Sequence, residues 1–228
     1  MLLIYLINLL FHNPVAFIIT ITVIILPLFM SVAFHEYAHG YVAYKFGDMT
    51  PKLQGRLTLN PFVHLDLVGT LMLFIIGIGW AKPVMLNPLN YPNKTKQMLV
   101  ALAGPASNLL LAIVFGIIYA FLQAGNFGEI DSAIKTISEP FNIIIRINLT
   151  LAIFNMIPIP PLDGSRVLAW LLPEEFESYF FLIEPYAIML ILLMLFMGGF
   201  EILFKIVNFV QINLLELFKI FMHSIIAS

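Results

Sequence analysis

Cysteine is absent from this chain of 228 residues. Its absence excludes disulfide bonds, thiolate metal ligands and a thiol nucleophile, so histidine and carboxylate remain as ligands for a transition metal. Charge is also scarce, because charged residues make up 11% of the sequence and the net charge is −2, whereas about a quarter of a soluble domain is charged. No basic tail or basic face occurs, so a nucleic-acid partner is not expected.

Apolar residues dominate the composition. Hydrophobic residues form 61% of the chain and the mean hydropathy is +0.99, whereas roughly half of a soluble domain is apolar. This composition predicts an all-α polytopic membrane protein with about four to six membrane helices. No internal repeat or low-complexity segment divides the sequence, so residues 1–228 are expected to form a single domain.

The spans are predicted from the lengths of the apolar runs. The run 15–46 would measure ~48 Å as a helix, against a hydrocarbon core of ~30 Å, and Pro27 is expected to kink it. A second span is expected at 98–122. Residues 143–157 would form a helix of only ~22 Å, which should stop short of crossing. The C-terminal helices are expected at 179–226, with a span at 179–200 and a polar stripe from Lys205 onwards.

A small β-strand and re-entrant region is expected between the first two core spans. Residues 52–59 alternate between apolar and polar, which predicts a short strand. Residues 67–79 are apolar but too few to cross a bilayer, which predicts a re-entrant or buried segment.

His35, Glu36 and His39 form a His-Glu-x-x-His motif near the end of the first run. On a helix this spacing places both imidazoles on one face, where they can bind one zinc ion beside Glu36. In a soluble protein the same pattern also arises by chance. Here, counting back from Lys45, His39 lies ~9 Å and His35 ~15 Å inside the membrane. Ionisable side chains at that depth are costly and mark function, so a metal site is predicted.

Asp163 is the predicted third ligand. It follows a proline-rich break at 158–161, and unwound backbone at membrane depth is tolerated only where it is buried or lines a cavity. A solvated Asp163 in an interfacial turn is the alternative. The positive-inside rule favours Asp163 as a metal ligand. A cytoplasmic loop between the first two spans would bring the His-Glu-x-x-His motif and Asp163 to the same, cytoplasmic side. The basic residues of that loop are Lys52, Arg56, Lys82, Lys94 and Lys96.

Two further groups of residues carry weaker signals. Gly104 allows close approach of helices, and Asn108 could form a hydrogen bond to a neighbouring helix. His64 and Asp66 either support the metal ligands from outside or only cap turns, and the sequence leaves both readings open.

Four motifs in order resemble those of the site-2 protease family of intramembrane zinc metalloproteases. Together they cover about residues 15–164, which is where the resemblance places the catalytic core. The motifs are His35-Glu36-x-x-His39, Asn60-Pro61-x-x-His64-x-Asp66, Gly104-Pro105-x-x-Asn108 and Asn155-x-x-Pro158-x-x-Pro161-Leu162-Asp163-Gly164.

The resemblance implies a metalloprotease with one zinc ion per chain, bound by His35, His39 and Asp163. Glu36 would activate water, and Asn155 would form a hydrogen bond near the scissile peptide. The implied substrate is a transmembrane-helix protein or peptide, cut within or near the membrane. The protein is expected in a bacterial or archaeal cell membrane as a multi-pass protein in contact with lipid, with its active site towards the cytoplasm.

A transition-metal transporter or metal-binding membrane protein is the alternative from another functional class. Glu36 favours the protease, because a transporter has no special need for a carboxylate beside the first histidine. The chain is expected to be a minimal family member without a PDZ or CBS domain. A strand at 52–59 would offer an edge that holds an unwound substrate extended.

Overall fold

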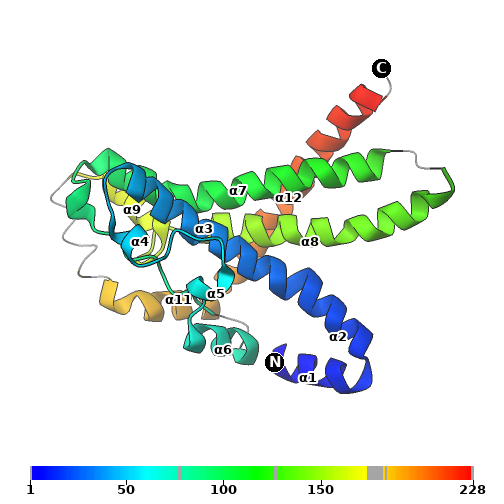
Figure 1. Cartoon of the computed structure of the whole chain (residues 1–228), viewed down its shortest axis with the longest axis horizontal. Coiled ribbons are helices and arrows are strands. Elements are labelled where there is room, and N and C mark those ends of the chain that lie inside the picture. The colour runs from blue at the N-terminus through cyan, green and yellow to red at the C-terminus, as the bar shows by residue number, and fades with distance from the viewer. Residues whose placement is uncertain (1, 77–78, 126–127, 174–181, 183, 227–228) are drawn as a thin grey trace.

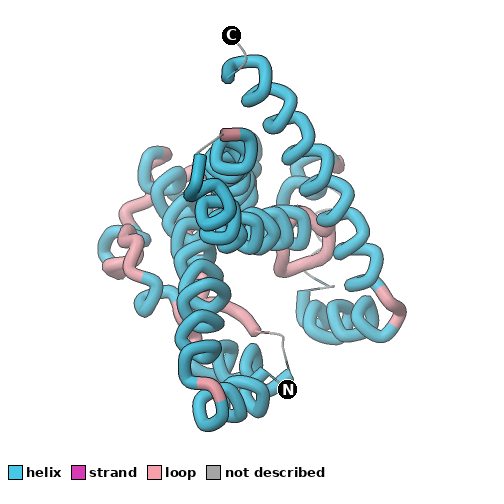
Figure 2. The backbone as a smooth tube through the Cα atoms, turned by 90° about the vertical axis from the view of Figure 1, so that its right-hand side faces the viewer, coloured by secondary structure: helices cyan, strands magenta, loops and turns pink. Residues whose placement is uncertain are grey.

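The computed structural model describes residues 2–76, 79–125, 128–173, 182 and 184–226. Throughout these ranges the regular structure is helical and no strand forms (Figure 2). Long helices meet at one end of the molecule, and several short helices lie around that end (Figure 1).

The first long helix is continuous from Pro14 to Lys45. It begins after a break at Asn13, whose Oδ1 accepts a hydrogen bond from the Ala16 N–H at 3.0 Å. A π-helical turn ends at Ile25, two residues before Pro27. Proline has no N–H to donate to the turn before it, and a wider turn accommodates that loss. The parts in order are α1 (Leu2–His12), α2 (Pro14–Thr20), the π-turn η1 (Ile21–Ile25) and α3 (Leu26–Lys45).

Two antiparallel helices, α7 (Lys94–Ala124) and α8 (Asp131–Asn155), form the centre of the structure, and α12 (Gly199–Ile226) packs across them (Figure 1). Their shared apolar core is buried, and Gln211 adds a polar contact by donating to the Asn142 backbone carbonyl (3.1 Å) and side-chain Oδ1 (2.6 Å). The core residues are Ala112, Tyr119, Ile145, Leu149, Leu203 and Val207.

Three helical segments of the described chain are long and apolar enough to cross a membrane: Pro14–Lys45, Lys94–Ala124 and Gly128–Asn155. This is fewer than the four to six predicted. The third segment is longer than expected, because the helix begins well before residue 143 and can therefore cross. The predicted span at 179–200 lies partly outside the described residues. Its described part, α11 (Ala187–Phe196), is only 10 residues long.

The predicted β-region is wrong. Where a strand was expected at 52–59, the chain forms the short helix α4 (Thr50–Leu53) and then turns at Gly55, whose φ is +67°. That left-handed conformation does not fit an extended strand. A single isolated bridge joins Leu65 and Ala81 in the described chain. The strand edge proposed to hold a substrate is therefore absent from the described residues.

The remaining elements are short, and several of them lie near the end of α3 (Figure 1). α6 has an exposed apolar face and contacts α1, so it is not buried within the protein. Residues 81–87 form a non-helical strap that crosses beside α3. Asp48 fixes the end of the strap by accepting a hydrogen bond from the Asn87 N–H at 2.8 Å. The short elements are α5 (Pro61–His64), α6 (Leu67–Ile76), η2 (Pro88–Asn90), η3 (Gly128–Ile130), α9 (Asp163–Leu171) and η5 (Glu184–Tyr186).

Candidate metal centre

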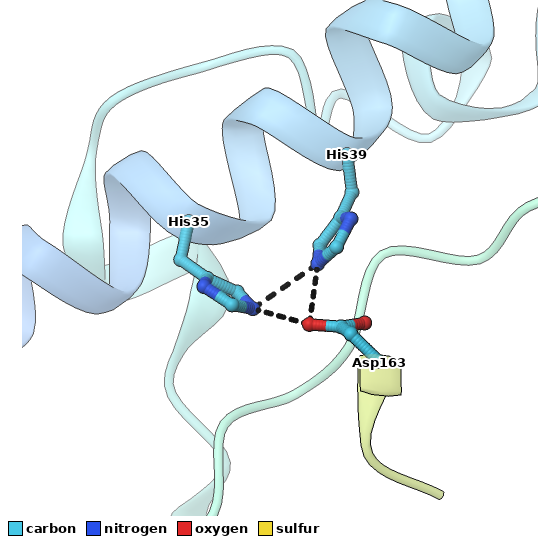
Figure 3. A group of neighbouring side chains, drawn as sticks. All are labelled: His35, His39 and Asp163. Atoms are coloured by element: carbon cyan, nitrogen blue, oxygen red, sulfur yellow. Dashed lines mark hydrogen bonds and ion pairs between the residues drawn. The ribbon is translucent and has the colours of Figure 1, made fainter. Parts of the chain in front are cut away.

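The three predicted metal ligands meet at one point. Asp163 Oδ2 lies 3.2 Å from His35 Nε2 and 3.3 Å from His39 Nε2, and the two Nε2 atoms are 3.1 Å apart (Figure 3). Both histidines project from one face of α3, whereas Asp163 begins α9. Residues more than a hundred positions apart in the sequence therefore form one side-chain cluster.

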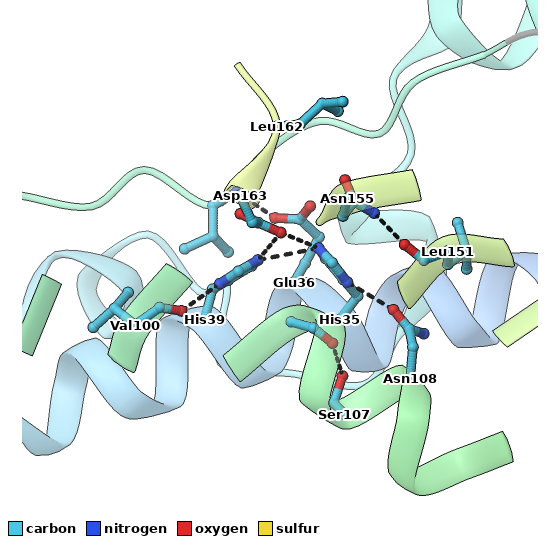
Figure 4. Close-up of polar contacts among 12 residues, drawn as sticks. His35, Glu36, His39, Val100, Ser107, Asn108, Leu151, Asn155, Leu162 and Asp163 are labelled. Carbon is cyan, nitrogen blue, oxygen red and sulfur yellow. Dashed lines mark hydrogen bonds and ion pairs between the residues drawn. The ribbon is translucent and has the colours of Figure 1, made fainter. Parts of the chain in front are cut away.

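The other ring nitrogen of each histidine contacts a fixed acceptor (Figure 4). His39 Nδ1 lies 2.7 Å from the backbone carbonyl of Val100, and His35 Nδ1 lies 2.7 Å from Asn108 Oδ1. A carbonyl oxygen can only accept, so the proton of neutral His39 is on Nδ1 and its Nε2 carries a lone pair.

Asn108 fixes the same tautomer for His35. Its Nδ2 donates to the backbone carbonyl of Ser31 at 3.1 Å and to Asn148 Oδ1 at 3.0 Å. Asn148 is oriented in turn, because its Nδ2 donates to the Ile144 carbonyl at 2.9 Å. These contacts leave only Oδ1 of Asn108 to face His35, so His35 donates from Nδ1. The expected cross-helix hydrogen bond of Asn108 is confirmed, and it links α3, α7 and α8.

This arrangement points three lone-pair-bearing atoms at one another. Asp163 Oδ2 is buried and has no hydrogen-bond donor in the described structure, a costly state for a carboxylate oxygen unless a cation lies beside it. Tetrahedral zinc with bonds of ~2.0–2.1 Å separates its ligand atoms by about 3.3 Å. The observed separations of 3.1–3.3 Å match that value, so the donor set fits zinc.

Gly104 of α7 keeps space beside the two imidazoles. A Cβ at this position would lie 2.3 Å from His39 Nε2 and 2.6 Å from His35 Nε2. Both distances are far shorter than a van der Waals contact. A side chain on residue 104 would therefore occupy the space next to both donor atoms.

Asp163 is placed by a close approach between α9 and the end of α8. The chain leaves the helix after Asn155 and re-enters one at Asp163, as the prolines predict. A Cβ on Gly164 would lie 2.2 Å from the Met156 carbonyl oxygen, so only glycine permits this packing. The Ser165 hydroxyl donates to the Leu162 carbonyl at 2.7 Å and secures the first turn.

The cluster opens into a cavity of about 160 Å³ that also holds Glu36 and Asn155. Glu36 Oε2 accepts a hydrogen bond from the Val84 N–H of the strap at 2.8 Å. Asn155 Nδ2 donates to the Leu151 carbonyl of its own helix at 2.9 Å. The lining residues are His35, Glu36, His39, Pro83, Val84, Leu86, Val100, Ala101, Asn155, Pro161, Asp163 and Arg166.

His64 and Asp66 do not join the metal cluster. Asp66 Oδ1 accepts a hydrogen bond from the Gly69 N–H at 2.7 Å, and His64 Nε2 lies 2.8 Å from the Thr58 carbonyl. The structure thus favours the turn-capping reading for Asp66. Sequence reasoning missed the contacts of Asn148 and Val84 and the position of Arg166 in the cavity wall, since no motif or spacing marks them.

The sequence model of peptidase family M50 matches this chain over residues 23–136 and 125–199. A Bacillus subtilis protein named "Putative zinc metalloprotease YwhC" is 37% identical over 199 residues, covering 86% of this chain and 90% of its own length. Rip2 of Mycolicibacterium smegmatis, with the same description, is 30% identical over 162 residues, 68% of this chain and 60% of that protein. No solved structure matches the chain. Because the family model covers most of the sequence and the ligand set fits zinc, the chain belongs to peptidase family M50 and is a zinc metalloprotease.

Proposed function

We propose that this metalloprotease hydrolyses peptide bonds within or near the transmembrane segments of membrane-protein substrates. The observation that carries the proposal is the location of the cavity. His35 and His39 lie in the second half of Pro14–Lys45, and the residues that orient them lie in Lys94–Ala124 and Gly128–Asn155. All three segments are long and apolar enough to span a bilayer.

His35, His39 and Asp163 would hold zinc, and Glu36 would act as the base. Zinc in such a site polarises a carbonyl and lowers the pKa of water towards about 7. Glu36 takes a proton from the attacking water and passes it to the leaving amine. The Val84 N–H fixes the direction of the Glu36 carboxylate. Asn155, on the cavity wall, would donate a hydrogen bond to the substrate backbone.

The active site is proposed to lie towards the cytoplasm. At 1.5 Å per residue, His39 and His35 are ~9 and ~15 Å from Lys45 at the end of α3. Lys52, Arg56 and Lys82 lie between the first two spans, and Lys94 and Lys96 lie in the first turn of the second. This concentration of basic residues favours a cytoplasmic location for that side.

The test compares the wild type with Glu36→Gln. Both purified proteins are expected to hold about one zinc ion per chain, measured by elemental analysis. Only the wild type should cleave model transmembrane peptides in proteoliposomes, because loss of a general base costs about 10²–10⁴-fold in rate. Glu216→Gln, a matched substitution at an exposed position of α12, should cleave normally.

Two results would contradict the proposal. Undiminished cleavage by Glu36→Gln would remove Glu36 from the reaction. Transport of metal across liposomes by both proteins, without any cleavage, would favour the transporter instead.

A further inference from the structure

Arg166 contributes the only positively charged side chain among the residues that line the cavity. The other charged lining residues are Glu36 and Asp163, and neither forms an ion pair with Arg166 within the described structure. Arg166 is also exposed, so its guanidinium is accessible to a molecule that enters the cavity. With no ion-pair partner among the described residues, Arg166 is available to bind a substrate group.

The position of Arg166 is fixed relative to the metal ligands. It follows Asp163 by three residues on α9, a spacing that puts both side chains on one face of a helix. Burial raises the pKa of the Tyr91 hydroxyl, and the Arg166 guanidinium offsets part of that increase. Arg166 also lines the same cavity as Val84 of the strap and Val100 of α7, so its side chain borders the space that the metal ligands open into.

We propose that Arg166 selects substrates that carry a carboxylate close to the scissile bond. The proposal rests on the proposed protease function and specifies its substrate class. A guanidinium presents a planar fork of N–H donors that matches the two oxygens of a carboxylate. An acidic side chain and the free carboxyl end of a short peptide share this chemistry.

A carboxylate fits better than the scissile carbonyl oxygen as the partner of Arg166. Groups that stabilise a developing oxyanion act most strongly where water is excluded, whereas Arg166 is exposed. In the zinc-bound protein the charge of the metal would offset the carboxylates of Glu36 and Asp163, so these two groups would not exclude an anion from the position beside Arg166.

The experiment uses binding as well as cleavage, on the full chain. Model transmembrane peptides carry Glu, Gln or Lys at each of the four positions on either side of the cleavage site. Their affinities are measured by fluorescence anisotropy with Glu36→Gln, and with that variant combined with Arg166→Gln or Arg166→Glu. Cleavage of the same peptides is measured with Glu36 intact. Arg146→Gln, an exposed arginine of α8 outside the cavity, is the matched control.

We expect one position at which Glu is preferred over Gln by about tenfold in affinity and in kcat/KM. Arg166→Gln should abolish that preference, Arg166→Glu should reverse it in favour of Lys, and Arg146→Gln should leave it unchanged. Peptides that end just after the cleavage site, as free acids or amides, distinguish the two sources of carboxylate. A preference for the acid form alone would assign Arg166 to the chain terminus.

Several results would overturn the inference. These are an equal Glu preference in Arg166→Gln and wild type, an equal loss of kcat on every peptide, or an effect that follows the anionic lipid content of the vesicles. Because binding is measured without turnover, an Arg166-dependent preference in the absence of cleavage would contradict the protease proposal and support the carboxylate site. Cleavage without any carboxylate preference would support the protease proposal and contradict the carboxylate site.

Discussion

Gly104 lies where no side chain can be accommodated without displacing a ligand. Its missing Cβ would approach His39 Nε2 to 2.3 Å and His35 Nε2 to 2.6 Å. The glycine is therefore required by the metal and not only by the packing of two helices. The sequence indicated close helix packing at this position, but it could not show that the neighbours would be the two donor nitrogens.

Replacement of Gly104 by alanine should remove zinc. The added methyl would force both imidazoles away from their ligand positions, so we expect less than about a tenth of a zinc ion per chain. Elemental analysis measures this result. Gly116→Ala is the control on the same helix, because the nearest atoms to its methyl would belong to the side chains of Phe218 (2.8 Å) and Leu214 (4.0 Å) and not to a metal ligand. Normal zinc content in Gly104→Ala would show that the ligands do not bind where we place them.

Asn108→Ala should weaken zinc binding without preventing it. Loss of the contact to His35 Nδ1 releases both the tautomer and the ring orientation, and substitutions of this kind typically lower metal affinity by about 10–100-fold. Chelator competition gives the affinity. Asn213→Ala on the exposed side of α12 should retain the affinity of the wild type. An equal affinity in Asn108→Ala would mean that His35 needs no such support.

At the level of the elements, the strap depends on one buried carboxylate. Asp48 is fully buried and accepts hydrogen bonds from the Asn87 and Thr50 N–H groups and the Asn90 side chain. Burial would raise the pKa of Asp48, but these donors, led by the Asn87 N–H, lower it below its usual value. The same strap directs Glu36 through Val84, so Asp48 fixes the catalytic cavity from outside it.

Asp48→Asn should destabilise the protein at neutral pH by about 1–3 kcal/mol, because an amide has one acceptor oxygen and leaves a buried N–H unpaired. Since folding lowers the pKa of Asp48, its stabilisation is complete above about pH 4 and is lost as the pH falls through the lower folded value. Thermal unfolding of both proteins should therefore differ at pH 7 and converge below about pH 4. A difference that is independent of pH would contradict this linkage, and exposed Glu129→Gln serves as the control.

The strand predicted at residues 52–59 does not form. Alternating polarity predicted a strand, yet the pattern gives no information about pairing, and an isolated run has no neighbouring strand to bond. Gly55 adopts a left-handed φ of +67° and Thr50–Leu53 complete a helical turn instead. In contrast, the helix break after Asn155 was predictable, because prolines exclude helix for a local steric reason.

For the whole molecule, motifs and apolar run lengths predicted the first and second long helices and the meeting of His35, His39 and Asp163. They could not predict the hydrogen-bonded path through Asn148, or the placement of Arg166 in the cavity wall. Those features depend on how helices rotate against one another. A single sequence determines that rotation through packing, and no local pattern encodes it.

The proposed orientation can be measured directly because the chain has no cysteine. Leu89, which is 85% exposed beside the strap, and exposed Glu129 at the far end of α7 and α8 can each be replaced by a single cysteine. A membrane-impermeant maleimide should label Leu89→Cys only in inverted vesicles and Glu129→Cys only in right-side-out vesicles. The opposite pattern would place the active site outside the cytoplasm.

The division of the ligands between α3 and α9 has a consequence for biosynthesis. His35 and His39 emerge early from the ribosome, whereas Asp163 follows more than a hundred residues later. Until α7, α8 and α9 have been made and inserted, the nascent chain holds two imidazoles without their carboxylate partner. The protease therefore cannot hydrolyse any peptide bond before its own core is assembled.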